Sequence, residues 1–233
     1  MVKNAGLIGA GALLAYAAWL LTQQQQQDGT TTDTTTTDNS NSSGTDWLGS
    51  TDSVLTDASQ NTAEFIDNIT GGLLKVSNMA RVDPQDLNNP NVQAMLSVIR
   101  AGEGTNSDSG YRTLFGGRLF DSFSDHPKTT VKASGYTSTA AGAYQILSST
   151  WEETKRIMGL PDFSPRSQDL AALGRIAARG ALEDTKAGRF ESAVTKIARE
   201  WASLPGSPYG QPTISWAKAK SIFAMNGGEI YSA

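Results

Sequence analysis

The sequence predicts an α+β fold that is mainly α, with a small β-hairpin lobe, preceded by an N-terminal transmembrane helix and a disordered polar tether. Apolar residues recur at helical spacing in several segments after residue 89. Adjacent glycines at 116 and 117, between aromatic and aliphatic residues, are typical of a hairpin turn. The first 46 residues combine an uncharged apolar run with a low-complexity polar run, which is not the composition of a packed domain.

The composition excludes several kinds of site. The 233 residues carry a net charge of −4, which argues against a general nucleic-acid binder, since such proteins normally present a basic face. There is no cysteine, so a disulfide framework, a thiolate zinc site and a cysteine nucleophile are excluded. His126 is the only histidine, so a multi-histidine metal site is excluded as well. We therefore expect no metal and no cofactor.

Residues 1–22 are predicted to form a transmembrane anchor. No charge interrupts residues 5–21, and 17 residues in a helix approach the length that crosses a bilayer core of roughly 30 Å, so this run is expected to contact lipid. A cleaved signal peptide is an alternative, because Ala15-Tyr16-Ala17 has the small-x-small form of a cleavage site. A buried globular helix is the weakest of the three interpretations.

Residues 23–46 are predicted to be a disordered polar tether, because they are rich in Gln, Thr, Asp, Asn and Ser and almost free of large apolar side chains. A flexible coil of this length has an r.m.s. reach of about 25–30 Å. A domain attached to the anchor through this tether would act near a membrane surface.

Residues 47–85 are predicted to form a helical connector that packs on the domain after it. Its apolar face is interrupted at Gly71-Gly72. The residues of that face are Phe65, Ile66, Ile69 and Leu73. The alternative is an interfacial or partner-binding pair of helices.

The compact domain is predicted over residues 86–233. Its first helix begins at Asn89-Pro90, because an N-cap residue followed by proline is a common helix start. The apolar residues after it follow the i, i+3, i+4, i+7 pattern of a helix: Val92, Met95, Leu96 and Ile99.

A β-hairpin is predicted next, from Tyr111 to Asp121, with Gly116-Gly117 as its two-residue turn. Four helices are predicted after it from caps, breakers and apolar stripes. They run from Ser149, with Glu152 as its capping-box partner, to Gly159; from Ser164-Pro165 to Gly180; from Phe190 to Trp201, before a break at Pro205; and from a cap at Thr213, with Ile214, Ala217 and Ile222 inward.

Glu103 is an acidic residue in the middle of the first apolar stripe. At 100° per residue it falls between Leu96 and Ile99 on the helical wheel, so it faces the domain rather than bulk water. Desolvation and the carbonyl-rich end of the helix both disfavour the carboxylate, which raises the expected pKa. A carboxyl group that stays protonated near neutral pH is a general acid. The alternative is a buried ion pair with Arg100 or Arg112.

Four motifs follow one another in the domain: GEGTNSDSGYRTLFGGRLFDSFSDHP, STAAGAYQIL, LPDFSPRSQDLAAL and REWASLPGSPYGQ. Over residues 90–228 the chain therefore resembles the phage lambda-type endolysins, which are peptidoglycan lytic transglycosylases with a lysozyme-like fold. The resemblance implies that Glu103 is the single catalytic glutamate, in a family motif that has Ser where this chain has Gly102. An aspartate of the family pattern is Arg112 here, so the resemblance supports no acidic role at that position.

The family's GxYQ and YGQ elements imply which residues line the glycan cleft: Tyr144, Gln145, Tyr209 and Gln211. Asp125 and His126, from the SDHP stretch, are further candidates for substrate binding, although a turn-stabilising hydrogen bond is the stronger expectation for His126. Trp201 is expected in the core, because it completes an apolar stripe.

The resemblance implies cleavage of the MurNAc-GlcNAc β-1,4 bond. Glu103 would protonate the glycosidic oxygen and then deprotonate the muramoyl 6-hydroxyl, which closes a 1,6-anhydro ring. The alternatives are a hydrolytic muramidase, with Asp121 or Asp125 as second carboxylate, and a non-catalytic wall-binding virion protein. The anchor would hold the enzyme in a virion membrane, or in the host inner membrane with the domain facing the periplasm. Residues 47–85 would then contact virion or membrane proteins.

Overall fold

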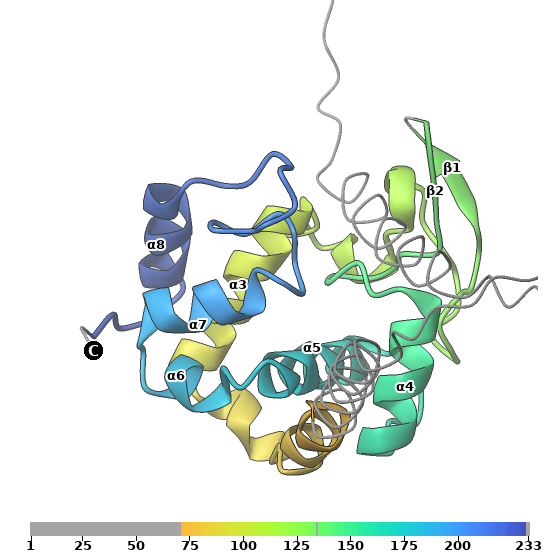
Figure 1. Cartoon of the computed structure of the whole chain (residues 1–233). Coiled ribbons are helices and arrows are strands. Elements are labelled where there is room, and N and C mark those ends of the chain that lie inside the picture. The colour runs from red at the N-terminus through yellow and green to blue at the C-terminus, as the bar shows by residue number, and fades with distance from the viewer. Residues whose placement is uncertain (1–70, 134, 232–233) are drawn as a thin grey trace, which may run out of the picture.

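The structure is a computed structural model that describes residues 71–133 and 135–231, and it is mainly helical with one small sheet (Figure 1). Residues 71–80, where the described part of the chain begins, are helical. The 3-10 helices are η1 (Pro84–Asn88), η2 (Gly110–Arg112) and η3 (Phe115–Gly117). The α-helices and strands are α3 (Pro90–Glu103), β1 (Val131–Ala133), β2 (Tyr136–Ser138), α4 (Ser148–Met158), α5 (Pro165–Ala178), α6 (Leu182–Lys186), α7 (Phe190–Ile197) and α8 (Trp216–Met225). The predicted class, α+β and mainly α, is confirmed.

Helix α3 is the element around which the others pack. It contacts α8, α6, α5 and η1, while α4 packs against α5 (Figure 1). The predicted stripe on α3 is buried throughout, with Val92, Met95 and Ile99 at 0% exposure. The C-terminal end of α3 is therefore held rigidly, which matters because that end carries Glu103.

Both ends of α3 follow from local sequence. The side chain of Asn89 accepts hydrogen bonds from the amides of Asn91 and Val92, and Pro90 occupies the first turn, where its missing N–H costs nothing. Gly104 ends the helix in the left-handed conformation, with φ of 71°, which favours glycine. The predicted start of the helix is confirmed.

The predicted hairpin from Tyr111 to Asp121 is present only as a short antiparallel turn, without regular strands. Two 3-10 turns flank a bridge between Thr113 and Leu119, and across it the amide of Leu114 donates to the carbonyl of Arg118 at 2.7 Å. The backbone of this stretch is bonded partly to another loop, since the amide of Phe115 donates to the carbonyl of Ala140 at 2.8 Å. The observed hairpin is β1 with β2, paired antiparallel with Val131 opposite Ser138, and it lies at the edge of the molecule (Figure 1).

The later helices lie close to their predicted positions, but the N-caps of α4 and α8 differ from the predicted residues. The N-cap of α4 is Leu147, without a side-chain hydrogen bond, so the predicted capping box at Ser149 is wrong. The last helix is capped by Ser215 rather than Thr213, and Ala217 is exposed while Ala219 is buried. Helix α5 begins at Pro165 behind the Ser164 cap, as predicted.

Two further elements differ from prediction after α5. Helix α6 (Leu182–Lys186) is not signalled by the sequence pattern, because its five residues are too few to show a period. Helix α7 ends at Ile197 rather than at Trp201. Trp201 nevertheless lies in the core, at 3% exposure, as predicted.

The N-terminal predictions lie largely outside the described residues. The anchor at 1–22, the tether at 23–46 and most of the connector at 47–85 fall there. Within the described part of the connector, Gly71 and Gly72 are helical rather than a break, and Leu73 is 66% exposed rather than packed inward. Within residues 71–133 and 135–231, no helix combines the length and the apolar character needed to cross a membrane.

Candidate active site

Glu103 occupies the last position of α3 and is 2% exposed. The hydroxyl of Ser203 donates a hydrogen bond of 2.6 Å to Glu103 Oε1. The second oxygen, Oε2, is buried and has no hydrogen-bond partner among the residues that the structure describes. The protein thus holds one carboxyl oxygen and leaves the other without a partner, in a helix end that cannot easily shift.

Burial controls the protonation of this carboxyl group. It raises the pKa of Glu103 from 4.5 to about 8, while the hydrogen bond from Ser203 opposes the rise because it favours the charged form. At neutral pH most of the carboxyl groups are protonated, and the charged form is still within reach. The raised pKa predicted from the apolar stripe is confirmed, and the group is suited to give up a proton and later take one.

The alternative of a buried ion pair at Glu103 is wrong. Arg100 lies over the ring of Tyr111, with its guanidinium carbon 5.0 Å from the ring centre. Arg112 lies over Phe123 at 4.2 Å. Neither arginine forms a salt bridge with Glu103 in the described part of the chain, so the carboxyl group is buried without a compensating charge.

The segment that presents Ser203 is fixed on two sides. The amide of Ile214 donates to the carbonyl oxygen of Ser203 at 2.9 Å. Two residues earlier, the indole nitrogen of Trp201 donates to the carbonyl oxygen of Tyr144 at 3.1 Å. The Ser203 hydroxyl therefore meets Glu103 from a backbone that is itself anchored.

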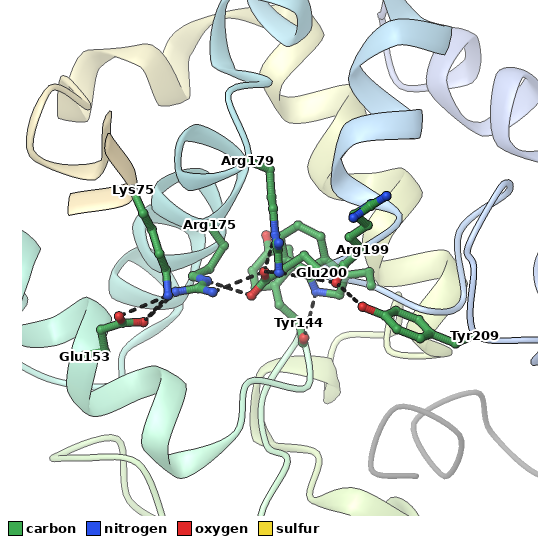
Figure 2. Close-up of polar contacts among 9 residues, drawn as sticks. Lys75, Tyr144, Glu153, Arg175, Arg179, Arg199, Glu200 and Tyr209 are labelled. Atoms are coloured by element: carbon green, nitrogen blue, oxygen red, sulfur yellow. Dashed lines mark hydrogen bonds and ion pairs between the residues drawn. The ribbon is translucent and has the colours of Figure 1, made fainter. Parts of the chain in front are cut away.

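An ionic network holds Glu200, which lies three residues before Ser203 in the same segment (Figure 2). Glu200 accepts from Arg175 Nε at 2.6 Å and pairs with Arg179 at 2.8 Å. Arg175 also donates to Glu153 at 2.8 Å, and Lys75 pairs with Glu153 at the same distance. Burial alone would raise the pKa of Glu200, but the two arginines hold it below its usual range. The network connects the 71–80 helix, α4 and α5 to the residues just before Ser203.

Two of the predicted glycan-lining residues use their polar groups inside the protein. Tyr144 is 1% exposed, and its hydroxyl donates to Asp169 at 2.6 Å. Gln145 is 6% exposed, and its amide nitrogen donates to the carbonyls of Thr113 at 3.1 Å and Gly142 at 3.0 Å. Their direct contact with glycan stays a prediction, because the structure gives each of them a supporting role.

The other two predicted glycan-lining residues lie in the loop before α8. Tyr209 is half-buried, and its hydroxyl donates to the carbonyl oxygen of Arg199 at 3.1 Å (Figure 2). Both polar atoms of the Gln211 amide are buried and have no partner in the described residues. Buried polar atoms are normally satisfied, so this amide is an exception, and its contact with glycan stays a prediction.

Asp125 forms a hydrogen bond with Trp151 and ion pairs with two lysines. It accepts hydrogen bonds from Trp151 Nε1 at 2.8 Å and Lys155 at 3.0 Å, and it pairs with Lys128 at 3.0 Å. Partial burial pushes the pKa of Asp125 upward, but these hydrogen bonds outweigh it and hold the pKa well below its usual range. Asp121, the other candidate second carboxylate, is exposed. A second carboxylate would act as base or nucleophile, and at Asp125 the three partners already occupy the carboxylate oxygens.

Both ring nitrogens of His126 make contacts within the protein, and its predicted contact with substrate stays a prediction. His126 is 3% exposed, its Nε2 lies 2.9 Å from the carbonyl oxygen of Ile146, and its Nδ1 accepts from the amide of Lys128 at 3.0 Å. Burial lowers the pKa of His126, so the neutral ring, with its proton on Nε2, matches both contacts. The expected turn-stabilising hydrogen bond is confirmed. Among the described residues, no three His, Asp or Glu side chains gather as a metal site would require.

Sequence reasoning missed two polar residues that hydrogen-bond to predicted site residues. Ser203 lies in the WASLPG stretch, but nothing in the sequence connects it to a glutamate 100 residues earlier. Asp169 accepts from the hydroxyls of both Tyr111, at 2.8 Å, and Tyr144. Burial raises the pKa of Asp169, and the two tyrosines oppose that rise. Only the fold brings these groups together.

Comparisons with known proteins identify the family of the chain. The family model described as Endolysin matches residues 93–230. The endolysin of Escherichia phage lambda is 41% identical over 126 residues, which cover 51% of this chain and 80% of that protein. The endolysin of Escherichia phage P2 is 37% identical over 154 residues, or 59% of this chain and 93% of that protein.

A solved structure gives the same result for the fold. The structure of phage lambda lysozyme in complex with a chitohexasaccharide superposes with a TM-score of 0.59 at 37% identity, and covers 61% of this chain and 97% of that one. A second structure, lysozyme from bacteriophage lambda, superposes with a TM-score of 0.55. The expected lysozyme-like fold is confirmed.

Proposed function

The chain belongs to the endolysin family of phage enzymes that degrade peptidoglycan, and from this premise we propose that it is a lytic transglycosylase with Glu103 as its single acid and base. The substrate is the glycan strand of peptidoglycan, cut at the MurNAc-GlcNAc β-1,4 bond. The observation that carries the proposal is one buried carboxyl group with a raised pKa and one unpartnered oxygen.

In the first step Glu103 acts as the acid. Its proton passes to the glycosidic oxygen as the bond from that oxygen to C1 of the muramoyl sugar breaks. Positive charge develops at C1, and the N-acetyl group of the same sugar can stabilise it. Because Ser203 already donates to Oε1, we assign the transferred proton to Oε2.

In the second step the same group acts as the base. The Glu103 carboxylate takes the proton from the muramoyl 6-hydroxyl, and that oxygen bonds to C1 to close the 1,6-anhydro ring. No water is consumed, and the glutamate ends protonated, ready for another cycle. A pKa near neutrality serves both steps, since it favours neither form strongly.

Hydrolysis is the competing outcome, and it normally needs a second carboxylate. The carboxylate of Asp125 is already held by Trp151, Lys155 and Lys128, which would compete with a base or nucleophile role, and Asp121 is exposed to solvent. Mass spectrometry of digested peptidoglycan separates the two reactions. We expect fragments with 1,6-anhydro-muramoyl ends. Reducing ends as the main product would mean hydrolysis, and binding to sacculi without release of fragments would mean a non-catalytic wall-binding protein.

The glycan contacts are part of the proposal. Gln211 offers an unpartnered donor and acceptor, and the half-buried ring of Tyr209 lies two residues before it. The complex of phage lambda lysozyme with a chitohexasaccharide supports binding of a β-1,4 glycan by this fold. Tyr144 and Gln145 would support the glycan-binding surface through their hydrogen bonds inside the protein.

Tethering to a membrane through residues 5–21 is a separate proposal that depends on sequence alone. An anchor of this kind would hold the enzyme close to the wall it cuts. Fractionation of infected cells alongside purified particles tests it. We expect the full chain in a membrane fraction; recovery of the full chain free of both membranes and particles would overturn the proposal.

A further inference from the structure

Gly102 lies directly before Glu103, inside α3, and faces Ser203. A Cβ atom at position 102 would come within 2.7 Å of Ser203 Oγ, closer than real Cβ atoms approach, and would make a tight contact of 3.3 Å with Ser203 Cβ. Glycine is a poor helix former compared with alanine. The helix thus carries an unfavourable residue at the one place where a methyl group would push the Ser203 hydroxyl away.

We propose that Gly102 and Ser203 are a positioning pair that orients the Glu103 carboxyl group and fixes which of its oxygens carries the catalytic proton. The inference rests on the proposed function of Glu103 and adds two residues to it. Ser203 directs its hydroxyl hydrogen at Oε1, so the proton of the acid form belongs on Oε2. Gly102 supplies the space in which this hydroxyl sits.

The hydroxyl has little freedom to point elsewhere. Ser203 is 3% exposed, and its carbonyl oxygen is held by the amide of Ile214 at 2.9 Å. Leu204 closes the same space, since its Cδ2 would lie 3.6 Å from a Cβ atom at position 102. A fixed donor keeps one carboxyl geometry through both steps and costs no rearrangement during the reaction.

No charged group competes with Ser203 for the carboxyl group in the described part of the chain. On α3, the guanidinium of Arg100 lies over the ring of Tyr111. On the segment before Ser203, Glu200 is paired with Arg175 and with Arg179. From α5, Asp169 faces the tyrosines. Ser203 is consequently the polar side chain that tunes Glu103 against the effect of burial.

Ser203→Ala tests the pair with two readouts, the pH profile of kcat/KM on purified peptidoglycan and the NMR titration of the Glu103 carboxyl carbon. Loss of a hydrogen bond to the charged form should raise the pKa, and we expect both the titration and the alkaline limit of activity to move up by about one pH unit. Loss of orientation should lower kcat about tenfold with KM little changed.

Gly102→Ala approaches the same contact from the other side. The added methyl group should displace the hydroxyl and shift both readouts in the same direction as Ser203→Ala. The double variant should shift them no further than Ser203→Ala alone, because both changes remove one interaction. Circular dichroism would check that each variant is folded.

Two control variants make the same types of substitution, Ser to Ala and Gly to Ala, at positions that do not contact Glu103 or Ser203. Ser97→Ala removes a hydroxyl that donates to the carbonyl of Gln93 on α3, and Gly72→Ala adds a methyl group where nothing lies within 4 Å. Both should keep the wild-type titration and pH profile. A folded Ser203→Ala protein with the wild-type titration of Glu103 would overturn the proposal, and wild-type behaviour of Gly102→Ala would overturn the part of Gly102. The titration does not depend on the products formed, so failure of the transglycosylase assignment would be seen separately, in the product ends.

Discussion

The indole nitrogen of Trp201 donates a hydrogen bond of 3.1 Å to the main-chain oxygen of Tyr144. This contact joins the segment that carries Ser203 to the loop that carries Gln145. The two sequence motifs expected to bind glycan, STAAGAYQIL and REWASLPGSPYGQ, are therefore joined directly by a hydrogen bond between Trp201 and Tyr144. Polar groups in these motifs divide into those that the protein already satisfies and those left without a partner in the described residues, and substitutions should separate the two kinds.

Glu103→Gln should abolish lysis and remove a pH dependence of stability. General acid catalysis contributes roughly 10² to 10⁴ in rate, so activity should fall at least a hundredfold. The folded pKa, about 8, is above the ordinary 4.5, so the folded state binds the proton more tightly. That stabilisation is fully present below pH 4.5 and is lost as the pH rises toward 8. Denaturant unfolding at several pH values measures it.

Over that range the wild-type protein should lose about 3–5 kcal/mol of stability relative to Glu103→Gln. The two proteins should differ least in acid and most in alkali. A constant difference across the pH range would contradict the raised pKa, and wild-type lysis by the variant would contradict the catalytic assignment.

Asp125→Asn should weaken the fold and leave the reaction in place. Asp125 joins Trp151, Lys155 and Lys128. Its pKa is lower in the folded than in the unfolded state, so the stabilisation is present above the ordinary carboxyl pKa and is lost as the pH falls through the folded value. Because the side chain is partly exposed, we expect a loss of about 1 kcal/mol at neutral pH after screening.

The measurement for Asp125→Asn is lysis per folded molecule, together with thermal unfolding. Activity close to wild type supports a single-carboxylate mechanism. A loss as large as that of Glu103→Gln would make Asp125 the second carboxylate and favour hydrolysis. Asp121→Asn, at an exposed position, is the matched control and should change neither property.

The sequence predicted the helices and Glu103 because those features depend on local patterns. Asn89 and Gly104 cap α3 through contacts within a few residues, and the apolar stripe follows from helical period alone. The predicted hairpin shrinks to a short turn: Gly116-Gly117 has positive φ and the flanking backbone pairs across it, but only through one bridge, while Thr113 and Phe115 also bond to the loop at residues 140–142. Turn chemistry predicts the turn, and it does not determine how far the residues beside it pair with each other.

The site was predictable only in part, for a related reason. Apolar spacing identified the burial of Glu103, and with it the direction of the pKa shift. Ser203 and Asp169 became visible only when distant segments met, and no spacing rule covers such contacts. The motifs containing Gln145 and Gln211 look alike in sequence, yet the fold satisfies the first amide and leaves the second without a partner.

Removing a charge from the ionic network should lower the stability of the protein by an amount that depends on how buried that charge is. Glu200 has a side chain that is 11% exposed and faces Arg175, which is 7% exposed, so Glu200→Gln leaves a buried arginine poorly paired. We expect a loss of about 3–5 kcal/mol in stability. Lys75→Gln removes a half-exposed pair with Glu153, and should cost about 0–1 kcal/mol.

Chemical denaturation of both variants, and of Lys220→Gln as a control for an exposed pair with Glu191, provides the measurement. Hydrogen exchange of the amides at 201–204 should rise in Glu200→Gln and not in the control. Equal losses for Lys75→Gln and Glu200→Gln would mean that burial does not govern the strength of this network.

Gln211 and Gln145 should respond in opposite ways to the same substitution. The amide of Gln145 donates to the carbonyls of Thr113 and Gly142, so Gln145→Met removes two buried hydrogen bonds and should cost about 1–3 kcal/mol. The amide of Gln211 is buried without a partner among the described residues, so Gln211→Met removes an unsatisfied group. Its stability should be unchanged or higher by about 1 kcal/mol, while KM for peptidoglycan should rise several-fold because the glycan loses that donor and acceptor. Thermal unfolding and initial rates on purified sacculi measure the two effects. A lower stability of Gln211→Met with an unchanged KM would mean that this amide is structural like that of Gln145, and the glycan contact would have to be sought elsewhere in the loop.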